Sequence, residues 1–256
     1  YAATFDFPLW MRPQDYYLSR NGFAHNGVVS SRLGLTGIPV SAETVALATL
    51  LTLAVDTGVR LHLGCLSSAA GMAMVVRAQS DGLPVSCDVG AHYLHLSESA
   101  IGFFDTATRL DPPLRSEADR AALREGVRAG HAAICSDHTT LAQDDKLLPF
   151  GSAKPGATGL ELLLPLTLKW GAESGLSLPE TLAPLTSLPA SVLGQDDLGH
   201  LGAGAKADIC LFDPEASWQV VPENLKSRSK DTPFAGQTLT GQVKMTLVGG
   251  EVVFSG

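Results

Sequence analysis

Asp137 is the residue of this sequence best placed for proton transfer or metal binding. It directly follows the apolar run 132–136, which is typical of a short buried strand. In parallel α/β proteins the chemistry lies at the carboxyl ends of strands, where a carboxylate can bind a metal ion or move a proton. The alternative interpretation is a turn or helix cap, because aspartate is common at the start of loops.

Other polar residues also follow apolar runs and are candidates for the same edge of a sheet. They are Arg12, Cys65, Asp88 with His92, and His138 beside Asp137. Cys65 could supply a thiolate ligand, although a single cysteine at a strand end is more often a small buried apolar residue. The histidines could hold a ligand, or they could bond to backbone groups.

Familiar catalytic motifs are missing from the sequence. No GxSxG, no P-loop and no GxGxxG follows a predicted strand, which argues against a serine hydrolase and against a nucleotide switch. No HxH or HExxH occurs either. A metal site built from this chain alone would therefore need unusual ligands.

Four units, each a short apolar run followed by a helical pattern, must position these residues. The predicted strands are 7–11, 59–66, 83–89 and 132–136, and the predicted helices are 42–56, 68–80, 116–129 and 159–170. Ser41 and Ser116 are predicted as N-caps. Strands alternating with helices at this period indicate an α/β fold with a parallel sheet and right-handed crossovers.

The pattern changes after Gly171. A helical segment is predicted over 179–193, followed by β runs at 207–212, 218–221 and 243–254, the last with a turn at Gly249 and Gly250. This region is predicted to be a small β appendage. Four strand-helix units would supply half of an eight-stranded barrel, so the sheet is either open or completed by another segment.

Composition narrows the class of protein. The 256 residues include 18 Lys and Arg against 26 Asp and Glu, a net charge of −8, without a basic run that could follow a phosphate backbone. Nucleic acid is not expected as a partner. The four cysteines form no CxxC pair, and no long apolar segment occurs, so we expect a cytoplasmic protein without membrane insertion. The chain begins at Tyr1, and we expect it to be part of a longer one.

Several segments together resemble the dihydroorotase branch of the amidohydrolase superfamily, in the same order and over nearly the whole chain. They are Gly34–Glu43, Asp111–Arg115, Ser136–His138, Gly156–Glu161, Gly202–Asp208, Phe212–Pro214, Ser229–Lys230 and Thr232–Phe234. The resemblance implies a (β/α)8 barrel of the TIM type with a small β-sandwich. It assigns residues 1–194 to strands five to eight of the barrel and 195–256 to the sandwich.

The family reaction implied by the resemblance is the reversible, zinc-assisted hydrolysis of the cyclic amide dihydroorotate to carbamoyl aspartate. Asp137 matches the aspartate that acts as base and acid and that also contacts the metal. The substrate-binding positions fall on Asp111, Arg115, Pro155 and Gly156.

The resemblance is weakest at the expected metal ligands. Two metal-binding histidines of the family fall on Arg12 and Cys65. Arginine stays protonated and has no free lone pair, so only Cys65 and Asp137 remain as metal candidates. An asparagine of the family is replaced by Asp111, and a histidine by Leu141. The site is therefore predicted to be degenerate.

The sequence motifs and the family resemblance lead to one main hypothesis and two alternatives. We expect a dihydroorotase-family protein of pyrimidine biosynthesis that is weakly active or non-catalytic, is a homo-oligomer, and accompanies aspartate carbamoyltransferase. The alternatives are an active zinc-dependent dihydroorotase or related cyclic amidohydrolase, and a module that binds a dicarboxylate without turnover.

Overall fold

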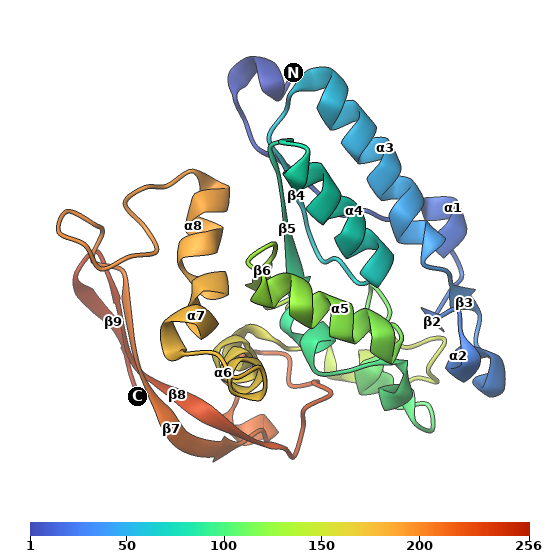
Figure 1. Ribbon diagram of the computed structural model, residues 1–256. Helices are drawn as coiled ribbons and strands as arrows, with labels where there is room; N and C mark the ends of the chain where they lie inside the picture. The colour runs from blue at the N-terminus through green and yellow to red at the C-terminus, as the bar shows by residue number, and fades with distance from the viewer.

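A four-stranded parallel sheet forms the centre of the chain (Figure 1), as the computed structural model of residues 1–256 shows. In spatial order the strands are β1 (Leu9–Met11), β4 (Leu61–Leu63), β5 (Val85–Gly90) and β6 (Ala133–Cys135). All three neighbouring pairs are parallel. The predicted α/β class with a parallel sheet is confirmed, and each strand is shorter than predicted or displaced by one or two residues.

Three helices follow β3, β4 and β5 in the chain and lie side by side in Figure 1: α3 (Ser41–Thr57), α4 (Ala69–Ser80) and α5 (Glu117–Arg128). Ser116 caps α5 in a capping box with Asp119, as its spacing predicted. Ser68 caps α4 by accepting a hydrogen bond from the Gly71 amide. The predicted cap at Ser41 is wrong, because Ser41 is already helical and Val40 precedes it without a side-chain cap.

Two long segments for which no strand or helix was predicted contain short elements. The first holds α1 (Tyr16–Ser19), β2 (Ala24–His25), α2 (Val28–Leu33) and β3 (Gly37–Ile38), with β2 and β3 paired in parallel. The second holds 3-10 helices at Ala91–Leu94, Glu98–Ile101 and Thr106–Thr108. Elements of two to six residues are too short to show a periodic apolar pattern.

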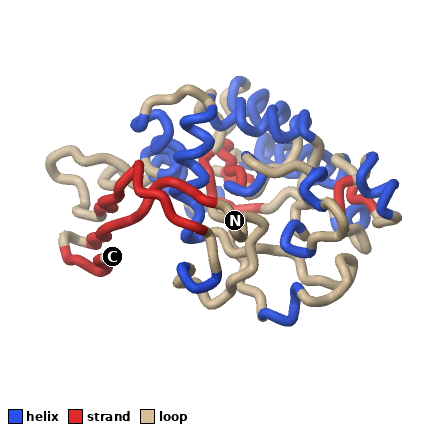
Figure 2. The backbone as a smooth tube through the Cα atoms, turned by 90° about the horizontal axis from the view of Figure 1, so that it is seen from below, coloured by secondary structure: helices blue, strands red, loops and turns tan.

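The carboxyl-terminal region has two parts (Figures 1 and 2). The helices are α6 (Leu163–Glu173), α7 (Leu178–Leu182) and α8 (Ser187–Leu193), and the antiparallel sheet contains β7 (Ile209–Gln219), β8 (Thr238–Val248) and β9 (Glu251–Ser255). The predicted helix 179–193 is interrupted by a 3-10 turn at Ala183–Leu185, because Pro184 cannot donate a backbone hydrogen bond. The two predicted strands 207–212 and 218–221 are one strand whose register shifts between Asp213 and Ser217, around Pro214.

A single large core joins the sheet to its helices and to the start of the β appendage. Its fully buried side chains include Leu63 of β4, Val89 of β5, Leu123 of α5 and Trp170 of α6. Phe234, from the segment before β8, belongs to the same cluster. Among the helices, none has both the length and the apolar character needed to cross a membrane.

The buried carboxylate of Glu43 joins α3 to the loop after β4. Its Oε2 accepts hydrogen bonds from the Ser67 amide at 2.8 Å and the Ser67 hydroxyl at 2.6 Å. Its Oε1 accepts from the Ser68 amide at 3.2 Å and the Ser68 hydroxyl at 2.5 Å. A Cβ at Gly71 would lie 2.1 Å from Oε1, so this close approach requires glycine in the first turn of α4.

We expect Glu43→Gln to destabilise the protein by about 3 kcal/mol, because the amide NH2 would face donors that need an acceptor. Urea denaturation followed by circular dichroism measures the change. Glu251→Gln, at an exposed position of β9, is the matched control and should change stability little. Equal effects of the two substitutions would contradict the role given to Glu43.

Candidate functional site

The candidate residues lie where the parallel strands end. Arg12 follows β1, Cys65 comes two residues after β4, and Asp137 comes two residues after β6. Cys65 and Asp137 both have positive φ angles, 56° and 44°, which are uncommon for residues with a side chain. The Cys65 thiol donates a hydrogen bond to Asp137 Oδ1 at 3.4 Å. Two strained residues from different strands thus meet, as is typical of functional sites.

Asp137 is largely buried, and its surroundings favour the protonated form. Burial raises the pKa of Asp137 to about 6, although the hydrogen bond from Cys65 and the positive charge of Arg12 act in the opposite direction. The Tyr93 hydroxyl lies 3.2 Å from Asp137 Oδ2 and 2.7 Å from the Pro112 carbonyl oxygen. Asp137 can therefore change protonation state near neutral pH.

Arg12 and Asp111 form an ion pair beside Asp137. The Arg12 guanidinium lies 3.4 Å from Asp111 Oδ1, and about two fifths of each side chain is exposed (40% and 37%). Gln14 also donates to Asp111 Oδ1, at 3.1 Å. The edge of the sheet thus carries an arginine–aspartate ion pair directly after β1.

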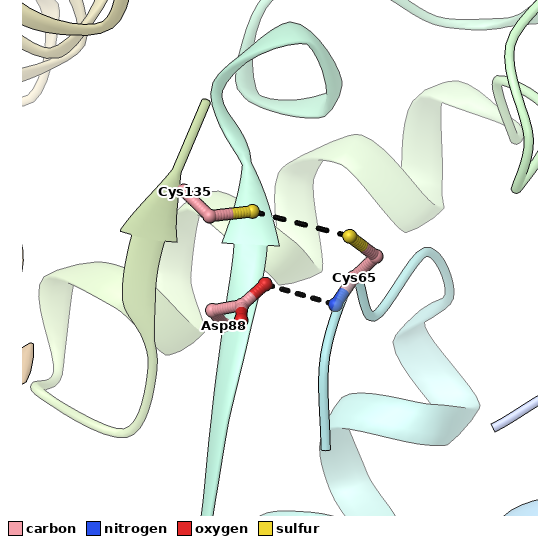
Figure 3. A group of neighbouring side chains, drawn as sticks. All are labelled: Cys65, Asp88 and Cys135. Carbon is pink, nitrogen blue, oxygen red and sulfur yellow. Dashed lines mark hydrogen bonds between the residues drawn. The ribbon is translucent and has the colours of Figure 1, made fainter. Parts of the chain in front are cut away.

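Cys65, Asp88 and Cys135 form a second cluster, which Figure 3 shows with side chains from within β5, from the end of β6 and from the loop after β4. The two sulfur atoms are 3.9 Å apart. Asp88 Oδ1 accepts a hydrogen bond from the Cys65 amide at 2.9 Å. The hydrogen bond with Cys65, together with burial, raises the pKa of Cys135.

The Asp88 carboxylate is held by a buried polar chain. Its Oδ2 lies 2.8 Å from His62 Nε2, and His62 Nδ1 lies 2.8 Å from the Ser86 hydroxyl. Burial alone would raise the pKa of Asp88, but hydrogen bonds from His62, Cys135 and the Cys65 amide hold it below its usual value. Asp88 is thus kept ionised although it is buried.

The substrate-binding positions implied by the resemblance are engaged in internal contacts. Arg115 is buried and donates to the Ile38 carbonyl oxygen at 2.6 Å and to the Ser67 hydroxyl at 3.1 Å. The Gly156 amide, next to Pro155, donates to the Arg109 carbonyl oxygen at 2.9 Å. Arg115 therefore supports the loop after β4, and the Gly156 amide has its partner within the protein.

His92, His95 and His138 do not belong to the group of Cys65, Asp88 and Cys135. His92 is fully buried, and its ring packs on Phe234. His95 bonds to the Leu166 carbonyl oxygen at 2.8 Å, and His138 Nδ1 accepts from the Gly159 amide at 3.2 Å. His62, in β4, has partners on both ring nitrogens, Asp88 and Ser86.

Sequence reasoning missed Cys135 and Tyr93 as parts of the site. Cys135 is the last residue of β6 and was counted with the strand, and Tyr93 lies in a 3-10 helix that carries no periodic pattern. One available signal was that Cys135 stands two residues before Asp137, at the end of the strand that brings Asp137 to the sheet edge.

The fold, the matching sequence profile and these strand ends together define the class: the chain belongs to the amidohydrolase family, whose profile matches residues 17–254. It is similar to a dihydroorotase-like protein of Pseudomonas aeruginosa, 44% identical over 257 residues, which cover 100% of this chain and 60% of that protein. It is also similar to a dihydroorotase of Syntrophus aciditrophicus, 40% identical over 99% of this chain and 60% of that enzyme. The chain is therefore dihydroorotase-like.

Solved structures give the same result for the fold. L-hydantoinase (dihydropyrimidinase) from Arthrobacter aurescens is 27% identical and superposes with a TM-score of 0.86, over 99% of this chain and 58% of that one. The chain thus spans about 60% of the length of the relatives that it matches.

Dihydroorotase and amidohydrolase family members are generally metal-dependent, and the residues present here do not fit the expected histidine ligands. Arg12 stands at one of the two positions where the resemblance expects a metal-binding histidine. Its guanidinium offers no lone pair and repels a cation. Cys65, at the other position, can ligate a metal but does not restore the set alone.

His92 makes the stability of the protein sensitive to acid. Burial, with smaller contributions from His95 and His138, lowers the pKa of His92 to about 4, whereas an unfolded histidine titrates near pH 6.5. The unfolded state therefore binds a proton first, and stability is lost as the pH falls from about 6.5 to 4. Between pH 7.5 and pH 5 we expect the unmodified protein to lose about 2 kcal/mol more of its free energy of unfolding than His92→Phe loses.

Urea denaturation at the two pH values tests this expectation. His200→Phe, in an exposed loop, is the matched control and should keep the full loss. An unchanged pH dependence in folded His92→Phe protein would show that other groups cause the sensitivity.

Proposed function

We propose that this chain acts as a non-catalytic or weakly active dihydroorotase-like companion of aspartate carbamoyltransferase in pyrimidine biosynthesis. The observation that carries the proposal is the Arg12–Asp111 ion pair at the end of β1. It puts the guanidinium of Arg12, which has no free lone pair, where the resemblance expects a metal ligand. A metal ion held there would lack one ligand, and the guanidinium would repel the cation.

The proposal includes the finer architecture expected from the sequence. In this interpretation β1, β4, β5 and β6 are the last four strands of a (β/α)8 barrel, with residues 1–194 in the barrel and 195–256 in the sandwich. Parallel strands are usually buried on both faces. The exposed Leu9, Trp10 and Met11 of β1 support a further strand or segment against this edge. A cytoplasmic homo-oligomer remains part of the proposal.

An active cyclic amidohydrolase is the second candidate, because one observation favours it. Asp137 is held next to Tyr93 with a pKa of about 6, a value suited to a group that accepts and returns a proton near neutral pH. The relatives are named dihydroorotase and hydantoinase, which are enzymes on cyclic amides.

Turnover of dihydroorotate separates the two candidates. We expect ring opening by the zinc-supplied protein to remain near the uncatalysed rate and to change less than about twofold in Asp137→Asn, because no proton transfer by Asp137 is rate-determining. Absorbance of dihydroorotate measures the rate. Measurable turnover that falls by about a hundredfold or more in folded Asp137→Asn protein would reject the non-catalytic proposal.

Association with the transcarbamoylase tests the companion role. We expect the protein to co-sediment with aspartate carbamoyltransferase of the same source in analytical ultracentrifugation, with each protein run alone as the control. Two unchanged, separate boundaries in the mixture would contradict the companion role and leave the assignment to the amidohydrolase family intact.

A further inference from the structure

We propose that Cys65, Cys135 and Asp88 form a binding site for a soft divalent cation such as Zn²⁺, where the loop after β4 meets β5 and the end of β6. This site is different from the histidine set that the family resemblance implies. The two sets share the position of Cys65. The proposed site adds Asp88 of β5 and Cys135 of β6, which do not stand at positions of the expected histidines. The inference does not depend on the proposed function.

The spacing of the donor atoms fits a tetrahedral ion. Zinc–sulfur bonds of about 2.3 Å place two thiolates of a tetrahedron about 3.8 Å apart. The sulfur atoms of Cys65 and Cys135 are 3.9 Å apart without any ion. Each of the three residues has a donor atom within 4.8 Å of the other two donors, so small side-chain rotations bring all three onto one cation.

A fourth ligand is needed to complete such a tetrahedron. Asp137 Oδ1 lies 3.4 Å from Cys65 Sγ, but Asp137 is not among the residues whose donor atoms all lie within 4.8 Å of one another. A water molecule can take the fourth position.

The surrounding contacts already orient the ligands. Asp88 is fixed by His62, which bonds in turn to Ser86, and ligating carboxylates in metal sites are usually held in this way. The Cys65 amide bonds to Asp88 Oδ1, which holds the positive-φ backbone of Cys65 against the strand end. Each Asp88 oxygen keeps a second lone pair for an ion.

Charge and access agree with a cation at this position. Two thiolates and one carboxylate carry three negative charges, so a divalent ion reduces the net charge of the group to −1. Both cysteines are partly exposed, which leaves a path for the ion. Two thiolates favour Zn²⁺, Cd²⁺ or Co²⁺ over Mg²⁺ and Ca²⁺, which prefer oxygen ligands.

Titration of the reduced, metal-free full chain with Co²⁺ tests the proposal. We expect a thiolate-to-cobalt charge-transfer band in the near ultraviolet that is removed by stoichiometric Zn²⁺. Cys65→Ser and Cys135→Ser should each weaken Co²⁺ binding by about tenfold or more, because each removes one of two sulfur ligands. Cys210→Ser, at an exposed position of β7, is the matched control and should leave the band unchanged.

A second measurement needs no variant. Zn²⁺ should protect Cys65 and Cys135 of the native protein from alkylation, as mass spectrometry of the peptides reports, and should leave Cys210 reactive. The proposal is overturned if the reduced protein gives no charge-transfer band, if the band persists in both folded variants, or if Zn²⁺ protects neither thiol. A reversible Cys65–Cys135 disulfide in place of metal binding would overturn it as well.

Discussion

The Glu43 carboxylate is the constraint on which the geometry of the strand ends depends. It accepts four hydrogen bonds from Ser67 and Ser68, and so fixes the loop between β4 and α4 from the side of α3. Arg115, which also donates to Ser67, holds the same loop from the segment before α5. Two charged side chains that are almost fully buried, Glu43 and Arg115, thus lie within one polar network. Cys65 lies near the start of the loop that this network holds in place.

The consequences of this anchor extend to the chemistry. Because the loop after β4 is fixed, Cys65 keeps a backbone conformation that an unconstrained cysteine rarely adopts, and its thiol lies between Cys135 and Asp137. The adjacent strand end carries the Arg12 charge, which faces Asp111. One edge of a single sheet therefore combines an anion held by an arginine with a pair of thiols beside two carboxylates. This combination differs in kind from a set of histidines around a catalytic ion.

Much of the fold was accessible from the sequence, and the site only in part. The alternation of apolar runs and helical patterns predicted the four parallel strands and α3, α4 and α5, since residues at these positions must bury one face. The elements between Tyr16 and Ile38 were not predicted, because they show no periodic apolar pattern. Local hydrogen bonds define them, such as those of the Ser30 hydroxyl with Gly27. Asp137 was found by its place after a strand. Asp137 contacts Cys65, and Cys65 contacts Cys135, because β4, β5 and β6 are neighbours in this order in the sheet. The spacing of residues along the sequence does not reveal that order.

The parallel pairing of the sheet also determines when this edge can form during folding. Leu9 pairs with Leu61, and Asp88 with Ala133, so each step closes a long loop before its contacts are gained. The hairpin of β8 and β9, by contrast, closes through the short turn at Gly249 and Gly250. The thiols and carboxylates come from three different strands, so they meet only after β6 has docked on β5. The site is therefore absent from any partly folded chain in which β6 is not in place.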